Sequence, residues 1–191
     1  MSTYYQDIYQ GHNISAVLRT CDNLGIQNIY IIQDSNEVTL SKGISLGSEK
    51  WVTMEIKRKN VPKKDYIKSL KKLGFKIIST VPPSKNKSIS LEKFKIEKKM
   101  IIAFGNEEKG LSREILEESD LLLSISMDGF NESYNISVSC AIVMNQLISE
   151  AKRNKKLTYL SNSEKTKLKF DWYVKSLKNS SRVIENLGKS K

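Results

Sequence analysis

The chain has 191 residues, of which 39% are hydrophobic and 28% charged, a composition typical of one folded domain with or without an appendage. No stretch approaches the roughly 18 apolar residues of a membrane-spanning helix, and the first residues show no secretory signal. Cys21 and Cys140 are too few for a disulfide framework or a four-cysteine zinc site. We expect both cysteines to be reduced and buried in a cytoplasmic protein.

Charge is distributed unevenly along the chain. Residues 151–191 hold 12 Lys or Arg and 3 Asp or Glu, whereas residues 1–150 hold 20 and 18, for a formal net charge of +11. This asymmetry is expected of a protein that binds a polyanion, because neutralising phosphates gives strong, sequence-independent and salt-dependent binding. Charge alone leaves open a nucleic-acid partner, a lysine-rich solubility tail or a membrane surface.

The first 150 residues alternate strand-like and helix-like segments, which predicts an α/β fold with a mainly parallel sheet. Apolar residues recur on one stripe of segment 14–24, and Gly25 follows it as a left-handed cap. Residues 100–104 form a continuous apolar run, as a buried parallel strand does. We expect strands at 4–9, 28–33, 51–56, 75–80, 100–104 and 121–125, and helices at 14–24, 65–73, 113–119 and 136–153.

The pattern changes near residue 155, where a lysine-rich segment begins. Ser161 followed by Glu164 is a capping-box signature, which predicts the start of a terminal helix. The apolar stripe of this helix consists of Leu168, Trp172 and Leu177.

These patterns predict two parts of the chain. We expect a domain over residues 1–154 and a basic, helical extension over 155–191, for which nucleic acid is the favoured partner among those that its charge leaves open. Trp172 and Tyr173 are the aromatic residues through which the extension would pack back on the domain.

Several common motifs are absent. Residues 105–112 have the glycine spacing of a phosphate-binding loop, but Leu111 stands where such a loop needs a lysine, and Glu107 and Glu108 would repel phosphate. No G-x-G-x-x-G motif follows an expected strand, which removes support for a Rossmann dinucleotide site. His12 is the only histidine, so a histidine-based zinc cluster is excluded and we expect no metal.

Segment 12–20 is the first of three that are unusual for purely structural sequence. It places Asn13 at a helix start and Arg19 nearly two turns further on, in a helix that otherwise looks buried. An unpaired buried charge is costly, so this guanidinium needs a partner. A local carboxylate such as Asp22 is the structural explanation, and a bound ligand is the functional one.

Segments 104–112 and 125–139 each follow an expected strand, at the carboxyl end where α/β folds bind ligands. Glycines in the first of them allow a ligand to approach the backbone closely, although a tight turn before a capped helix would use them too. Ser133 and Asn135 in the second are natural helix-entry residues, so simple capping is the alternative there.

Taken in order, the three segments resemble the signature motifs of the SpoU/TrmH family of SPOUT RNA methyltransferases. The residues that carry the resemblance are His12-Asn13-Ile14-Ser15-Ala16-Val17-Leu18-Arg19-Thr20, Phe104-Gly105-Asn106-Glu107 and Ile125-Ser126-Met127 with Tyr134-Asn135. It extends over about residues 5–153. It implies a SPOUT fold with a trefoil knot formed by the second and third segments, and a homodimer whose active site is completed across the interface. It also implies S-adenosylmethionine as donor and a 2′-O-methyl ribose as product.

The resemblance further implies roles for individual residues. Arg19 would contact the ribose hydroxyl and stabilise developing negative charge, since an arginine pKa above about 12 suits a base poorly. Asn13 would orient Arg19, while Glu107 and Asn135 would anchor the loops around substrate and donor. His12 is an alternative base because its pKa is near neutral. The donor would be bound by Thr80, Gly105, Ile125, Met127 and Tyr134.

Three positions depart from the family's usual pattern. Gln10-Gly11 stand where the family shows an Asp-Pro pair, Ser126 replaces a proline, and Tyr134 replaces a leucine. We expect Tyr134 to alter the adenine pocket and donor affinity rather than the fold.

A catalytic core followed by a basic C-terminal helix resembles the branch of the family that methylates guanosine 18 in the D-loop of tRNA, which we take as the expected substrate. Methylation of the tRNA wobble ribose or of an rRNA nucleotide is the alternative activity. A catalytically weak RNA-binding homologue is a further alternative. Arg19 and Asn135 are both present, which favours an enzyme.

Overall fold

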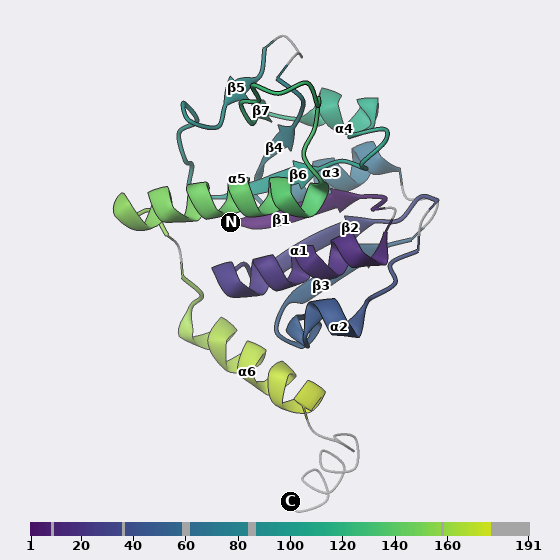
Figure 1. Cartoon of the computed structure of the whole chain (residues 1–191). Coiled ribbons are helices and arrows are strands. Elements are labelled where there is room, and N and C mark those ends of the chain that lie inside the picture. The colour runs from purple at the N-terminus through teal and green to yellow at the C-terminus, as the bar shows by residue number, and fades with distance from the viewer. Residues whose placement is uncertain (9, 36, 59–61, 84–86, 158, 177–191) are drawn as a thin grey trace, which may run out of the picture. The chain divides into compact units, whose positions relative to one another are not determined.

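The structure is a computed structural model that describes residues 1–191 apart from 9, 36, 59–61, 84–86, 158 and 177–191 (Figure 1). The chain divides into two compact units, residues 1–157 and residues 158–191, and each is considered by itself. Within the described residues, no helix combines the length and the apolar character needed to cross a membrane.

The first unit is built on a seven-stranded sheet in the order β3-β2-β1-β6-β4-β7-β5. Every pair of neighbouring strands in it runs parallel, which confirms the expected sheet type. The two strands near its centre, β1 and β6, are buried along their whole length, as the continuous apolar run of β6 predicts. The strands are β1 (Ser2–Gln6), β2 (Asn28–Ile32), β3 (Thr53–Lys57), β4 (Lys76–Thr80), β5 (Ile89–Ser90), β6 (Met100–Phe104) and β7 (Leu121–Ser124).

Helices cover both faces of this sheet (Figure 1). On one face α1 (Gly11–Leu24) packs against α5 (Ile136–Arg153), and on the other α3 (Lys63–Lys72) packs against α4 (Arg113–Glu118). Successive side chains of β1 point to opposite faces of the sheet and so belong to different hydrophobic cores. Tyr5 lies in the core beside α1 and α5, where its ring stacks on that of Phe104 with 5.3 Å between the ring centroids. Tyr4 lies in the core beside α3 and α4. Two short elements, α2 (Lys42–Ser45) and η1 (Ser48–Lys50), lie between β2 and β3.

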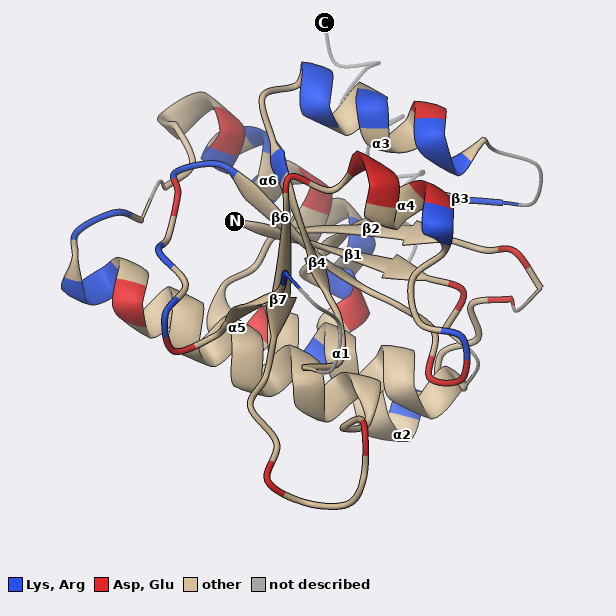
Figure 2. Ribbon diagram, turned by 90° about the horizontal axis from the view of Figure 1, so that it is seen from above, with Lys and Arg blue, Asp and Glu red and all other residues tan. Residues whose placement is uncertain are grey.

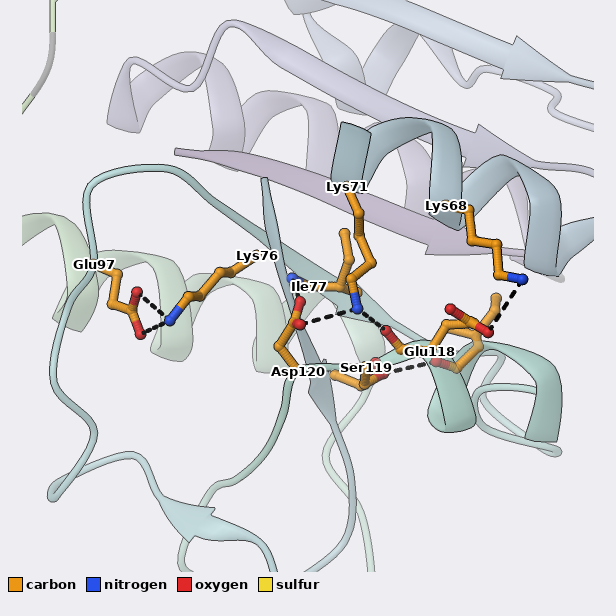
Figure 3. Close-up of polar contacts among 10 residues, drawn as sticks. Lys68, Lys71, Lys76, Ile77, Glu97, Glu118, Ser119 and Asp120 are labelled. Atoms are coloured by element: carbon orange, nitrogen blue, oxygen red, sulfur yellow. Dashed lines mark hydrogen bonds and ion pairs between the residues drawn. The ribbon is translucent and has the colours of Figure 1, made fainter. Parts of the chain in front are cut away.

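Ion pairs join α3 to the last residue of α4 and to the segment between α4 and β7 (Figure 3). Lys68 pairs with Glu118 at 4.0 Å and Lys71 with Asp120 at 2.9 Å. The other carboxylate oxygen of Asp120 accepts the backbone N–H of Ile77 at 2.8 Å. Asp120 therefore joins the start of β7 to β4 and to α3.

Most expected elements are confirmed, and the shifts have identifiable causes. The strand expected at 4–9 is β1, which begins at Ser2 because it pairs with β2 and β6 on both sides and ends before Asp7, whose φ is 49°. The helix expected from residue 14 begins at Gly11. A Cβ at Gly11 would lie 2.6 Å from the carbonyl oxygen of Thr39, so glycine at this position permits a close approach of the chain. The short α2, η1 and β5 were not predicted.

The second unit contains α6 (Asn162–Ser176). Its capping box is confirmed: the Glu164 carboxylate accepts the backbone N–H of Ser161 at 2.8 Å, and the Ser161 hydroxyl oxygen accepts the N–H of Glu164 at 3.3 Å. Leu177, expected on the apolar stripe, lies outside the described residues. Packing of Trp172 and Tyr173 on the domain stays a prediction.

Candidate active site

A pocket of about 280 Å³ lies beyond the carboxyl ends of β4, β6 and β7. This is the edge of a parallel sheet where α/β proteins bind their ligands. Its lining comes from the loops after these strands and from the first turn of α5. It includes all five residues that we expect to bind a methyl donor, namely Thr80, Gly105, Ile125, Met127 and Tyr134.

The loop after β6 folds back on itself beside this pocket. Asn106 and Gly110 form an antiparallel bridge, and Gly110 has a φ of 67°. A Cβ at Gly105 would lie 2.2 Å from the backbone nitrogen of Leu111, so only glycine is accommodated there. The tight-turn explanation of these glycines is thus correct, and residues 105–110 of the same turn line the pocket.

Asn106 was expected only as part of the motif, with no role of its own, and in the structure it ties this turn to Asp7, the residue that follows β1. Its Nδ2 donates to the carbonyl oxygen of Asp7 at 2.7 Å, and its Oδ1 accepts from the backbone N–H of Glu108 at 2.9 Å. The signal was an asparagine inside a glycine turn, a residue type whose side chain bonds to nearby backbone.

Three polar side chains from the three sequence segments meet at the start of α1. Asn13 is 8% exposed, and its Nδ2 donates to the carboxylate of Glu107 at 2.5 Å. The Nδ2 of Asn135 donates to Oδ1 of Asn13 at 3.1 Å. Asn13 lies in the first turn of α1, Glu107 in the loop after β6 and Asn135 at the end of the loop that leads into α5, so the bonds hold the three segments in one arrangement.

Asn135 also caps α5, as its residue type suggested. Its Oδ1 accepts the backbone N–H of Ser137 at 2.9 Å and the Ser137 hydroxyl at 2.7 Å. Capping and the bond to Asn13 use different atoms of one amide, so the cap leaves Asn135 able to join the polar cluster. Its role in anchoring a loop around substrate and donor stays a prediction.

Arg19 does not join this cluster, and the expectation of a buried guanidinium is wrong. Leu18 and Cys21 are fully buried, whereas Arg19 is exposed, because successive helical residues are rotated by about 100°. No ion pair between Arg19 and Asp22 occurs in the described part of the chain. His12, the alternative base, is also exposed.

The apolar and charged residues that line the pocket indicate which kinds of ligand it can bind. Apolar side chains such as Val81, Phe104 and Ile136 offer contacts for a flat ring, and the folded turn offers backbone groups. The charged lining residues are Glu107, Glu108 and Glu132 against Lys109. This balance suits a ligand with positive charge better than a phosphate. Among the described residues, no group of three His, Cys, Asp or Glu side chains could hold a metal ion.

The two cysteines belong to the core between α1 and α5. Cys21 and Cys140 are free and buried, and the hydroxyl of Tyr5 lies 3.0 Å from the Cys140 sulfur. Burial raises the pKa of Tyr5 well above its usual value, so the phenol stays neutral.

A parallel sheet with a pocket at its strand ends, beside which three polar side chains meet, defines the class of α/β proteins that bind a ligand at the carboxyl edge of the sheet. The sequence profile of the SpoU rRNA Methylase family matches residues 3–145. The chain therefore belongs to the SpoU methylase family.

Individual relatives agree with this assignment. The chain is 41% identical over 183 residues to the tRNA (guanosine(18)-2′-O)-methyltransferase of Borreliella burgdorferi, which covers 95% of this chain and 81% of the relative. It is 29% identical to the protein of the same name from Aquifex aeolicus, over 95% of this chain and 85% of that one. A crystal structure of the A. aeolicus TrmH/SpoU tRNA modifying enzyme superposes with a TM-score of 0.80, at 28% identity, over 93% and 89% of the two chains.

Proposed function

We propose that this protein transfers the methyl group of S-adenosylmethionine to the ribose 2′-hydroxyl of guanosine 18 in the D-loop of tRNA. The observation that carries the proposal is how much of the chain the relatives match. The family profile ends at residue 145, whereas the two relatives named for this reaction match 95% of the chain and so include most of the basic extension over 155–191.

The pocket supports S-adenosylmethionine as the donor. Its apolar side chains suit the adenine, and its excess of carboxylates suits a sulfonium cation and an amino group. When bound there, this cofactor supplies an electrophilic methyl group. Thr80, Gly105, Ile125, Met127 and Tyr134 are the residues that would bind it, largely through the backbone of the folded turn.

The polar cluster supports a positioning mechanism. Much of the rate of methyl transfer comes from aligning the attacking oxygen with the methyl and its leaving group. The bonds of Asn13 to Glu107 and Asn135 fix the loops that border the donor pocket. We assign Arg19 the role of contacting the ribose hydroxyl and stabilising the negative charge that develops as the proton leaves.

The exposure of Arg19 supports a homodimer in which each active site is completed by the partner subunit. A guanidinium on the outer face of α1 is free to reach the pocket of a second copy. Mixed dimers test this: one subunit carries Arg19→Ala and the other Asn135→Ala. Completion across the interface leaves one intact site in each mixed dimer, so about half of the wild-type activity returns. An arginine that serves its own subunit restores none.

The finer features of the fold follow from the same family assignment. We propose that the loops 104–112 and 125–135, which both border the donor pocket, form a trefoil knot, and that the extension over 155–191 contacts RNA. We also propose a cytoplasmic location, where unmodified tRNA is available.

The decisive experiment incubates the protein with labelled S-adenosylmethionine and an unmodified tRNA transcript and then maps the methylated ribose. A matched transcript with deoxyguanosine at position 18 lacks the acceptor hydroxyl. We expect incorporation at position 18 of the first transcript and none in the second. Labelling at the wobble ribose, or of rRNA only, would assign the alternative substrates, and binding without labelling would indicate a non-catalytic homologue.

A further inference from the structure

A basic surface far from the pocket is formed by two segments that are distant in sequence. The loop before β6 and the C-terminal end of α5 are joined by a hydrogen bond from Lys156 Nζ to the carbonyl oxygen of Ile96, at 3.3 Å. Figure 2 shows Lys and Arg gathered along this loop and at this end of α5. Lys99 and Lys156 are also exposed, but their ammonium groups donate to backbone carbonyl oxygens. We call the remaining exposed cations of the two segments the edge cluster; its members are Lys93, Lys95, Lys98, Lys152, Arg153 and Lys155.

The apolar side chains of the loop hold it in place. Phe94 and Ile96 are buried in the core shared with α1 and α5, at 4% and 5% exposure, while the lysines between and beside them are exposed. Ala151 and Leu157 of the other segment contact the same core. The edge cluster therefore lies on folded backbone of the first unit, residues 1–157, and its shape does not depend on residues 158–191.

Neighbouring acids compensate few of the charges of the edge cluster. Hydrogen bonds to the carboxylate of Glu92 hold its pKa below the usual value, and Lys93 lies close enough to contribute to this lowering. In the described part of the chain, none of its six members forms an ion pair. Three carboxylates occur in the same two segments, and one of them, Glu97, pairs with Lys76 at 2.7 Å.

Helix α3 is also rich in lysine, but most of its lysines form ion pairs. Its residues Lys64 and Lys68 both approach Glu118, and Lys71 pairs with Asp120 (Figure 3). Of these two basic surfaces, only the edge cluster offers several unpaired cations to a polyanion.

The position of the edge cluster sets the size of its ligand. Ile136, at the first turn of α5, lines the donor pocket, and Arg153 ends the same helix 17 residues further on. At 1.5 Å per residue the two residues are about 26 Å apart. A donor molecule or a single nucleotide cannot contact both places, whereas a folded RNA can.

We infer that the edge cluster is a second RNA-binding surface, which holds the phosphate backbone of the tRNA outside the arm whose ribose is methylated. The inference rests on the proposed function for the identity of the RNA. Lysine and arginine on a fixed surface contact phosphates without reading bases, so this surface contributes affinity and orientation but no sequence preference.

The test compares two full-length variants that lose the same formal charge. One carries Lys95→Ala, Lys152→Ala and Arg153→Ala, and the matched control carries Lys64→Ala, Lys68→Ala and Lys72→Ala on α3. Binding of each to a whole tRNA transcript and to an isolated D-arm stem-loop is measured over a range of salt concentrations. Thermal melting verifies that both variants are folded.

For the edge-cluster variant we expect at least a tenfold loss of affinity for whole tRNA and a salt slope shallower by about 3, since each lost phosphate contact lowers the slope by about 1. Affinity for the stem-loop and kcat at saturating tRNA stay at the wild-type values, while KM rises. Wild-type affinity of this variant for tRNA overturns the inference, as does an equal loss in the α3 control or on the stem-loop. Failure of the proposed function is separate, because it appears as wild-type protein that does not methylate guanosine 18.

Discussion

Asn13 and Asn135 are 122 positions apart in the chain, yet the Nδ2 of Asn135 donates a hydrogen bond to Oδ1 of Asn13 at 3.1 Å. The Nδ2 of Asn13 in turn donates a hydrogen bond to the carboxylate of Glu107. Because Asn13 is nearly buried, each of its two polar atoms depends on these partners to replace water. One amide thus connects the starts of α1 and α5 with the loop after β6.

Replacing Asn13 by alanine tests this connection. We expect methyl transfer to fall by about 100-fold, since a displacement of about 1 Å in a positioned site has that effect. The loss in stability should be only about 1–3 kcal/mol, as for other buried groups that lose a hydrogen-bond partner. Activity assays and thermal melting of the same sample separate the two effects.

The control for this change is Glu107→Gln. Glutamine keeps an oxygen that can accept from Asn13, so this variant should retain more activity than Glu107→Ala if the role is positional. The double variant Asn13→Ala/Asn135→Ala should lose less than the sum of the single losses in free energy, because both remove the same bond. Strict additivity would show that the two residues act independently.

Arg19→Ala should abolish methyl transfer without affecting the fold. Arg19 is exposed and forms no ion pair in the described part of the chain, so we expect a stability change within about 0.5 kcal/mol. Affinity for tRNA should remain largely intact, since the basic extension and the edge cluster keep their charges. An Arg19→Ala protein with wild-type methylation would exclude the role assigned to this residue.

Gly105→Ala should damage the donor pocket directly. The added Cβ would meet backbone atoms of Gly110 and Leu111 at 2.2 Å, and backbone cannot move aside as a flexible side chain can. We expect the affinity for S-adenosylmethionine, measured by calorimetry, to fall at least tenfold, because the folded turn must open. Gly129→Ala is the matched control, since its Cβ would have no neighbour within 4 Å. Equal affinities in the two variants would argue against the turn as a donor-binding element.

The sequence predicted the layers of the fold well because they depend on local patterns. The apolar stripe of α1, its end at Gly25 (φ 72°) and the continuous apolar strand β6 are all readable from neighbouring residues. The early start of α1 is not, because it depends on the contact between Gly11 and Thr39, two segments 28 positions apart. Periodicity gives no information about such contacts.

The position of the candidate site could be predicted from the order of strands and helices along the chain, but its long-range side-chain contacts could not. Strand ends in a parallel sheet meet at one edge, so the loops after β6 and β7 were expected to face a ligand, whereas Thr80 at the end of β4 was expected only from the family resemblance. The hydrogen bond of Asn13 to Glu107 needed the tertiary structure. Arg19 was misjudged because its neighbours Leu18 and Cys21 are buried, although helix geometry turns it outward.

The capping box of α6 gives a pH-dependent prediction. Hydrogen bonds from the side chain and backbone of Ser161 hold the pKa of Glu164 below its usual value. The ionised carboxylate therefore supports the helix start at pH values above the usual glutamate pKa. This support is lost as the pH falls through the lowered pKa of the folded form. In an NMR titration, the Glu164 midpoint should lie lower in the wild type than in Ser161→Ala. Coinciding midpoints would mean that the box is not formed in solution.

Truncation after Leu157 separates the contributions of the two units to RNA binding. Residues 158–191 carry eight Lys or Arg and three Asp or Glu, so their removal takes away much of the net positive charge. We expect the shortened protein to bind S-adenosylmethionine as before, because every lining residue of the pocket precedes the cut. Its affinity for tRNA should fall more than tenfold and its salt dependence should become shallower, though not flat, because the edge cluster is retained.

The full-length variant Lys165→Gln/Lys167→Gln/Lys169→Gln is the control for loss of the polypeptide itself, since it keeps the extension and removes charge from α6. It should lose a part of the same affinity and salt slope. If truncation leaves both the affinity and the slope unchanged, the extension has no role in RNA binding and its lysines serve solubility alone. If truncation weakens binding but the glutamine variant does not, α6 contacts RNA through groups other than these three charges.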